Sequence, residues 1–249
     1  MKERRMTFHF VADAPLHETD DMVRNHHYSH RPATGCIYRA ALADDTGRLV
    51  AAVMFRLPPT RWSRPVMELT RLVRLPDVRA PLTSLISKAC ADLRRRKLAD
   101  LLVSFADSTQ GHHGGVYQAA SWKYHEQRKA QNDGFLLDGE FVPRRTAYGR
   151  FGGSSRVAMR VFCEVWGYEF QEHWDTGKHL YWRALTRQGE QHAKELGLRE
   201  LPYPKTDSLP LAEKQNEPTA DHLTKRSGLR IAPGAVCPGQ GADSFADLA

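Results

Sequence analysis

The stretch that decides the fold is residues 66–107, VMELTRLVRLPDVRAPLTSLISKACADLRRRKLADLLVSFAD. A strand is expected over residues 66–75, and Pro81 suits the first position of a helix. Apolar side chains then recur at helical spacing, and the cationic run at residues 94–97 complements the C-terminal end of that helix. Residues 100–107 form a nearly continuous apolar run, which is typical of a buried central strand. Strand, helix and strand in this order predict one parallel crossover.

The segments on both sides of the crossover predict antiparallel pairing. Residues 35–42 and 49–55 are expected strands that form a hairpin around the turn Asp44-Asp45-Thr46-Gly47. Further along, Asp138-Gly139 is a strong hairpin signal between two short apolar runs. Helices over residues 116–121 and about 155–166 and a last strand over residues 179–185 complete the series. The sequence therefore predicts a mixed α/β (α+β) domain with a mainly antiparallel sheet and one parallel strand–helix–strand crossover.

Composition divides the chain into three parts. Residues 1–19 are expected to be an N-terminal extension, and residues 20–200 one compact domain. Residues 201–249 shift to Pro, Lys, Asp, Gln and Gly without periodicity, which predicts a poorly structured polar tail. Of the 249 residues, 41% are hydrophobic and 26% charged, so the chain can form a core without disulfides.

Charge and cysteine usage bear on the partner and the compartment. The formal net charge of +7 favours a polyanionic partner such as DNA, because lysine and arginine release phosphate counterions; simple solubility is the alternative. The chain has no CxxC pair, so the pattern fits a reducing compartment and neither a disulfide framework nor a cysteine-based zinc site. No apolar run is long enough for a signal peptide or a membrane helix. We therefore expect a cytoplasmic protein with no membrane partner.

The most chemically dense segment is His26-His27-Tyr28-Ser29-His30-Arg31. Its imidazoles and its phenol are suited to metal binding or general base catalysis, whereas an exposed polar loop is the alternative. The spacing of the histidines matches no standard zinc template.

A second group of reactive side chains follows the buried strand, in DSTQGHHGGVY at residues 107–117. Asp107 ends the strand, and a glycine-punctuated loop with His112 leads into a helix. Sites in α/β sheets lie at such strand ends, next to helix N-termini. A carboxylate there can act as a base or as a metal ligand, and capping of the loop is the alternative role.

The strand over residues 66–75 carries both charge signs among apolar residues. Either Arg71 or Arg74 pairs with Glu68 or Asp107, or one of these arginines binds an anion beside the central strand. The residues leave both interpretations open.

Basic residues stand beside aromatic ones in three segments, at residues 61–64, 122–125 and 144–151. A cation beside a stacking ring is what a splayed or extruded base needs, although Trp and Tyr usually lie in cores. On this pattern Arg144 and Arg145 are candidates for substrate binding.

Four stretches together resemble the phage Mom family of DNA adenine-modifying proteins: SFADSTQGHHGGVYQAASWKY from residue 104, ELTRLVRL from residue 68, PLTSLISKA from residue 81 and GKHLYW from residue 177. The resemblance covers about residues 20–185. It implies a GNAT-like (acetyltransferase-like) fold and the transfer of a carbamoylmethyl-type group to the exocyclic amine of adenine, which protects phage or prophage DNA from restriction. It also implies a requirement for iron.

The resemblance also assigns roles to residues. The catalytic residues that it implies are His27, Tyr28, Arg71, Asp107 and Tyr117, with Tyr38 and Ser84 as further candidates for substrate binding beside His112. His27 and Asp107 are the metal ligands of this expectation.

The loop before the central helix departs from the wider acetyltransferase pattern. Residues 76–83 read PDVRAPLT and contain no glycine, so backbone amides cannot crowd a pyrophosphate as easily as in a glycine-rich loop. This speaks against conventional acetyl-CoA use and leaves an acyl-CoA-type donor in question. Two alternatives to DNA modification stay open: a GNAT-type N-acyltransferase that acts on a protein or a small molecule, and a non-catalytic nucleic-acid-binding protein.

Overall fold

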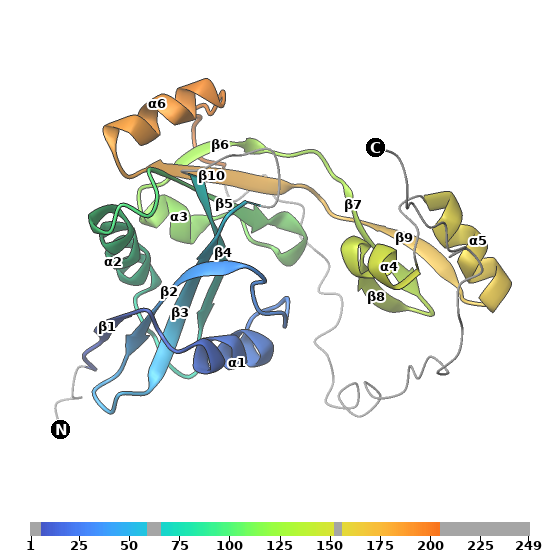
Figure 1. Ribbon diagram of the computed structural model, residues 1–249, viewed down its shortest axis with the longest axis horizontal. Coiled ribbons are helices and arrows are strands. Elements are labelled where there is room, and N and C mark those ends of the chain that lie inside the picture. Colours follow the sequence, from blue (N-terminus) through green and yellow to red (C-terminus); the bar gives the residue numbers. More distant parts are fainter. Residues whose placement is uncertain (1–5, 59–65, 152–155, 205–249) are drawn as a thin grey trace, which may run out of the picture. The chain divides into compact units, whose positions relative to one another are not determined.

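The structure, a computed structural model, describes residues 6–58, 66–151 and 156–204. The chain divides into two compact units, whose elements are labelled in Figure 1. The described part of unit 1 comprises residues 6–58, 66–131 and 175–204, and the described part of unit 2 comprises residues 132–151 and 156–174. The sequence predicts one domain over residues 20–200, whereas the structure inserts unit 2 between Gln131 and Asp175.

Unit 1 is built on one twisted sheet with the order β1-β2-β3-β4-β5-β10-β6. Its strands are β1 (His9–Ala12), β2 (Cys36–Ala43), β3 (Leu49–Arg56), β4 (Val66–Arg74), β5 (Leu101–Asp107), β6 (Lys123–Gln127) and β10 (Lys178–Ala184). Neighbouring strands pair antiparallel except β4 and β5, which are parallel and joined by helix α2 (Leu82–Arg95). The predicted mixed sheet with its single crossover is confirmed.

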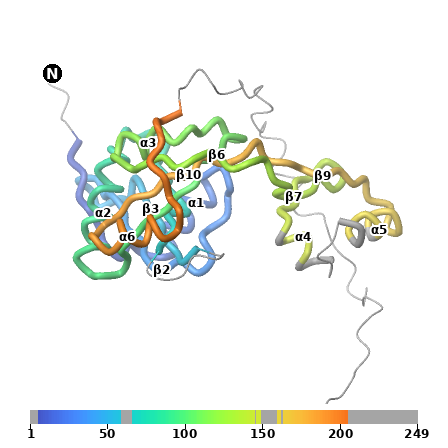
Figure 2. Tube along the Cα trace, turned by 90° about the horizontal axis from the view of Figure 1, so that it is seen from above, coloured from blue at the N-terminus to red at the C-terminus, as the bar shows by residue number. Residues whose placement is uncertain are grey.

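Helices cover both faces of this sheet. On one face lie α2 and the short α3 (Gly115–Ala119). A 3-10 turn, η1 (Ser108–Gln110), precedes α3, and Figure 2 shows α3 beside β6. On the other face lie α1 (Leu16–His26) and α6 (Arg187–Glu195). Adjacent residues of β2 show the two faces, because Tyr38 bonds to Asp92 of α2 and Arg39 pairs with Asp20 of α1.

The N-terminal segment is part of the fold from His9 onward. Residues 9–19 were expected in an extension, but β1 pairs with β2 as the edge strand and α1 packs against the sheet. The buried face of α1 consists of Thr19, Asp20, Met22 and Val23. Only two of these four side chains are apolar, so periodicity alone does not reveal the helix.

Unit 2 has its own sheet, with the order β8-β7-β9, and its own core. Its elements are β7 (Asn132–Leu137), β8 (Glu140–Pro143), α4 (Arg144–Phe151), α5 (Arg156–Trp166) and β9 (Phe170–Trp174). The predicted hairpin is present as β7–β8, and both residues of its Asp138-Gly139 turn have positive φ, as a tight hairpin turn requires. The fully buried Phe135, Ala147, Met159 and Cys163 form the centre of the core.

The segment after α6 stays attached to unit 1 as far as it is described. The Leu201 N–H donates to the carbonyl of Tyr124, and the Tyr203 hydroxyl donates to the carbonyl of Trp122. Residues 201–204 of the expected tail therefore belong to unit 1, and residues 205–249 lie outside the described residues. Among the helices that the structure describes, none has the length and apolar content that a membrane crossing requires.

Candidate active site

The site begins where two parallel strands part. The pairing of β4 with β5 runs from Val66↔Leu101 to Leu69↔Ser104 and stops there. Beyond that point β4 follows β3 as far as Arg74, and β5 follows β10 as far as Asp107. The two halves of the sheet therefore diverge, and a cavity of about 590 Å³ lies in the opening.

The cavity gathers most of the predicted catalytic side chains. His27 and Tyr28 directly follow the C-terminal end of α1, Asp107 ends β5, His112 lies in the following loop and Tyr117 lies in α3. The sequence placed these residues in two separate segments, and the fold brings them to one opening.

His27 is buried and held in one tautomer. Its Nδ1 accepts the Ser29 backbone N–H at 3.1 Å, and the Ser29 hydroxyl lies 2.9 Å from the same nitrogen. Burial, helped by Arg71 and His112, lowers the pKa of His27 to about 4. The ring is therefore neutral at pH 7, and because Nδ1 is an acceptor, the proton sits on Nε2.

Tyr28 lies between two imidazoles. Its ring centroid is 4.3 Å from that of His27 and 5.6 Å from that of His112. Loss of hydration raises the pKa of Tyr28, and the Asp107 carboxylate adds to this effect. Loss of hydration also lowers the pKa of His112, against the pull of Asp107. At neutral pH the site thus holds a protonated phenol beside uncharged imidazoles.

Tyr117 lies at the apex, where the strands part. Its hydroxyl oxygen is 2.8 Å from Oγ of Ser104, which is itself 2.9 Å from the carbonyl oxygen of Leu69. Burial raises the pKa of Tyr117 to about 12. A protonated hydroxyl is therefore fixed at the last strand pair and can donate a proton or a hydrogen bond into the opening.

Asp107 caps the loop that follows it and also faces a cation. Its Oδ1 accepts the Thr109 N–H at 3.1 Å, and its Oδ2 lies 3.3 Å from Nζ of Lys178. The capping role, stated as the alternative, is present together with the position at the cavity. Sequence reasoning missed Lys178, because nothing in one sequence indicates which residue of β10 lies opposite Asp107.

The loop beyond Asp107 depends on a glycine. Gly114 has a φ of +81°, and a Cβ on it would lie 2.2 Å from a ring carbon of Tyr181. That ring in turn donates its hydroxyl hydrogen to the carbonyl of His113 at 2.6 Å. The close approach fixes the loop over the cavity, as the glycine-rich sequence suggested.

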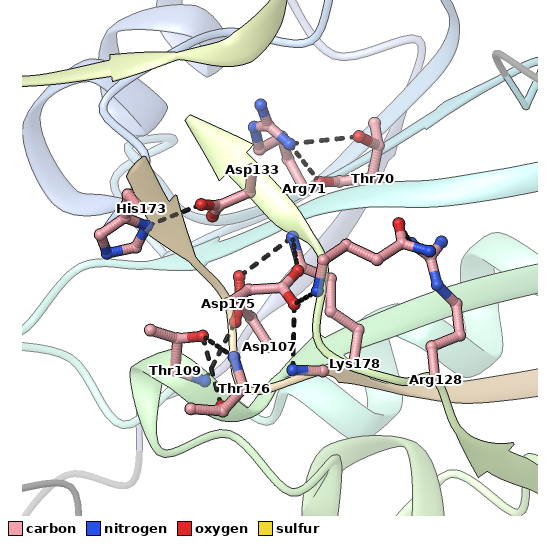
Figure 3. A network of polar contacts seen from close by, with 12 residues as sticks. Thr70, Arg71, Asp107, Thr109, Arg128, Asp133, His173, Asp175, Thr176 and Lys178 are labelled. Carbon is pink, nitrogen blue, oxygen red and sulfur yellow. Dashed lines mark hydrogen bonds and ion pairs between the residues drawn. The ribbon is translucent and has the colours of Figure 1, made fainter. Parts of the chain in front are cut away.

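Arg71 donates hydrogen bonds to two backbone carbonyls. Its Nη1 donates to the carbonyl of Thr70 at 2.7 Å (Figure 3). Its Nε donates to the carbonyl of Arg31 at 2.8 Å. These bonds tie the segment after His27 and Tyr28 to β4. The pairing with Glu68, which the sequence left open between Arg71 and Arg74, is formed by Arg56, whose Nη2 lies 3.2 Å from Oε2 of the buried Glu68.

Several other candidates lie elsewhere. Tyr38 is buried in the core and bonds to Asp92 at 2.9 Å, and Ser84 lines a different cavity beside β1 and α2. Trp122 and Tyr124 are buried, so this aromatic pair packs the core and stacks on no base. Arg144 is exposed in unit 2, and its Nε donates to the Tyr148 hydroxyl. The side chain of Arg145 and the basic segment at residues 61–64 lie outside the described residues.

The donor set does not fit an iron ion. His27 uses Nδ1 as an acceptor for Ser29, so its Nε2 carries the proton where a metal would need a lone pair. No cluster of three His, Cys, Asp or Glu side chains with the geometry of a metal site occurs in the described part of the chain. The predicted His27 and Asp107 metal pair is not supported.

The sequence profile of the Mom protein family matches residues 9–205. The chain belongs to the Mom protein family. The match covers nearly all of the described residues, including α1, whose end carries His27 and Tyr28. No curated protein matches this Mom family chain in sequence.

Solved structures similar to this Mom family chain include acetyltransferases, some of them described as GNAT family members. The ribosomal-protein-S18-alanine N-acetyltransferase from Escherichia coli has 10% identity and a TM-score of 0.43, over 74% of this chain and 97% of that one. A GNAT family N-acetyltransferase from Escherichia coli in complex with CoA has 12% identity and a TM-score of 0.38, over 49% and 72%. A GNAT family acetyltransferase from Elizabethkingia anophelis with acetyl-CoA bound has 11% identity and a TM-score of 0.37, over 72% and 97%.

Proposed function

We propose that this Mom family chain is a transferase that attaches a carbamoylmethyl-type group to the exocyclic amine of adenine in DNA. The product would protect phage or prophage DNA from restriction in the host cytoplasm. The observation that carries the proposal is the cavity between β4 and β5, which gathers an acid, neutral imidazoles and two phenols in a member of this family.

The chemistry of the acceptor suits these groups. The adenine amine is uncharged at neutral pH, so it can attack without first losing a proton. When the new bond to nitrogen forms, the amine must release one proton, and the leaving group of the donor departs with the bonding pair. The lowered pKa of His112 leaves this ring with a lone pair that can take the proton, and Tyr117 can supply a proton to the leaving group.

DNA as the substrate accounts for the basic composition. The net charge of +7 favours a phosphate backbone, and chemistry on an adenine amine requires the base to leave the stack. Tyr28 is exposed at the cavity and offers a ring against which an extruded base can stack.

The anionic part of a coenzyme A-type donor would enter beside Arg74 and Leu82 at the start of α2, which both line the cavity. Pro81 provides no side-chain cap there, so the first backbone N–H groups of α2 are open to an anion. The loop before it has no glycine, so the contact with a pyrophosphate would depend on Arg74 more than on a backbone cradle.

The test is the composition of DNA from cells that express the protein. Digestion to nucleosides and mass spectrometry should reveal a modified deoxyadenosine, and Asp107→Ala should abolish it. Unmodified deoxyadenosine throughout, with soluble protein present, contradicts the proposal. Tight acetyl-CoA binding without DNA binding would favour an N-acyltransferase, and DNA binding without any modified deoxyadenosine would favour a non-catalytic binding protein.

A further inference from the structure

The ammonium group of Lys178 lies between two buried carboxylates (Figure 3). The register of β10 against β5 sets Lys178 directly opposite Asp107, so both side chains project from the same face of the sheet. Nζ of Lys178 is 3.3 Å from Oδ2 of Asp107 and 3.8 Å from Oδ2 of Asp175. Loss of hydration alone would lower the pKa of Lys178, but the two carboxylates outweigh it and raise the pKa. The lysine is therefore charged at neutral pH.

Asp175 is anchored by the backbone around it. Its Oδ1 accepts the N–H groups of Gln131 at 2.9 Å and of Gly177 at 3.0 Å. Gly177 has a φ of +93°, and a Cβ on it would lie 2.2 Å from the carbonyl oxygen of Arg128. The turn that leads into Lys178 therefore has one backbone path, and the carboxylate that faces the lysine is fixed within it.

Asp107 keeps hydrogen-bonding capacity toward the cavity. Its two oxygens contact Thr109 N–H and Lys178, one each, while a carboxylate oxygen has two lone-pair sites. Its charge acts on both Tyr28 and His112, which line the same cavity. A lone pair of this carboxylate is thus available next to the imidazole and the phenol.

We propose that Lys178, itself held by Asp175, is a positioning residue that fixes the Asp107 carboxylate so that it accepts an N–H of the adenine amine. This inference rests on the proposed function. The amine is a neutral donor, and a carboxylate with fixed direction holds its nitrogen, and with it the attacking lone pair, in one orientation. The ion pair also offsets the carboxylate charge, which suits an uncharged partner.

The experiment compares variants for their yield of modified deoxyadenosine and for their affinity for duplex DNA. Lys178→Met should lower the yield about tenfold or more, since small misplacements of reacting groups carry large rate costs. Lys178→Arg restores a cation and should recover most of the yield. Lys123→Met is the matched control, because Nζ of Lys123 also lies 3.2 Å from each of two carboxylates, those of Glu190 and Glu200, outside the cavity.

The dissociation constant for DNA, measured by fluorescence anisotropy, should change less than about twofold in Lys178→Met, because positioning affects turnover and not the hold on the backbone. Full yield in Lys178→Met beside an active wild type overturns the inference alone. Equal losses of yield in Lys178→Met and Lys123→Met assign the lysine a merely structural role. If Lys178→Met does not fold, the yields of Asp175→Asn and Lys178→Arg test the inference instead. A wild-type yield in Asp175→Asn would show that Asp175 does not hold Lys178 in place. A wild type that leaves deoxyadenosine unmodified overturns the proposed function first.

Discussion

His27 couples the stability of the site to pH. In the folded protein its pKa is about 4, against 6.5 for an ordinary histidine. Between these two values the unfolded chain binds a proton that the folded chain does not, so acid destabilises the fold within this window. From pH 7 to pH 5 this one group should remove about 2 kcal/mol of stability, since each unit of pKa shift corresponds to about 1.4 kcal/mol.

The matched variant for this effect is His27→Asn. Its side-chain carbonyl can accept the Ser29 N–H as Nδ1 does, but it cannot take up a proton. Urea unfolding at pH 7 and pH 5 should therefore show a smaller loss for the variant than for the wild type. The same loss in both proteins would mean that His27 is not the group that titrates, and the other buried histidines would have to account for it.

A substitution at Tyr117 distinguishes the role of its hydroxyl in the reaction from its role in stability. Tyr117→Phe removes the hydroxyl that meets Ser104 and keeps the ring that packs against Trp122. Since Ser104 retains the Leu69 carbonyl as a partner, the loss of stability should be about 1 kcal/mol. The yield of modified deoxyadenosine should fall roughly 100-fold, as expected for the removal of a positioned acid. Unchanged yield would exclude Tyr117 as the proton donor.

At the scale of elements, the loop between β5 and α3 offers a comparison of two glycines. Gly111 and Gly114 both have positive φ, at +68° and +81°, but only Gly114 is crowded, by the ring of Tyr181. Gly111→Ala should cost about 1 kcal/mol from backbone strain alone. Gly114→Ala should cost at least twice that and lower the yield of modified deoxyadenosine, because the displaced Tyr181 ring packs against Tyr117. Urea unfolding of both variants measures these losses of stability. Equal losses would contradict the close approach of the Tyr181 ring to Gly114.

The elements that the sequence predicts well are those with a long, unbroken pattern. The run over residues 66–107 gives β4, α2 and β5 in their right order, because each has enough apolar positions to define its period. The four-residue β1 and the polar α1 are not predicted, because a short strand and a helix with two buried apolar side chains show no clear hydrophobic period.

The same reasoning applies to the site. Asp107 is predictable because it ends a buried strand next to a glycine-rich loop. The pairing of Lys178 with Asp107 is not, since it depends on which residue of a distant strand falls opposite. Tyr38 and Ser84 follow from the family resemblance, but the structure sets Tyr38 in the core and Ser84 in another cavity, because neighbouring residues of one element point to different faces.

At the scale of the whole molecule, the sequence does not reveal that unit 2 is separate. Its hairpin and helix are predicted like those of any single domain, with no sequence feature that marks a boundary. Only the three-dimensional packing shows that its apolar residues form a core among themselves. Five arginines, at positions 144, 145, 150, 156 and 160, lie within its helical region. Arg144 and Arg145 are the substrate-binding candidates among them, and we propose that these arginines hold the DNA backbone, so that affinity and chemistry reside in different units.

The junction between the units makes this testable. The Asp175 N–H donates to the Gln131 carbonyl at 2.9 Å, which is the bond that a two-residue turn between these residues would need. Replacing residues 132–174 with Asn-Gly should leave unit 1 folded, with one cooperative unfolding transition. DNA binding should weaken, and the slope of log affinity against log salt should fall by about 0.9 for each phosphate that the shortened protein no longer neutralises. Alanine at Arg144 and Arg145 in the full chain should reproduce part of that change, whereas an unchanged slope in the shortened protein would show that the DNA-binding arginines lie in unit 1.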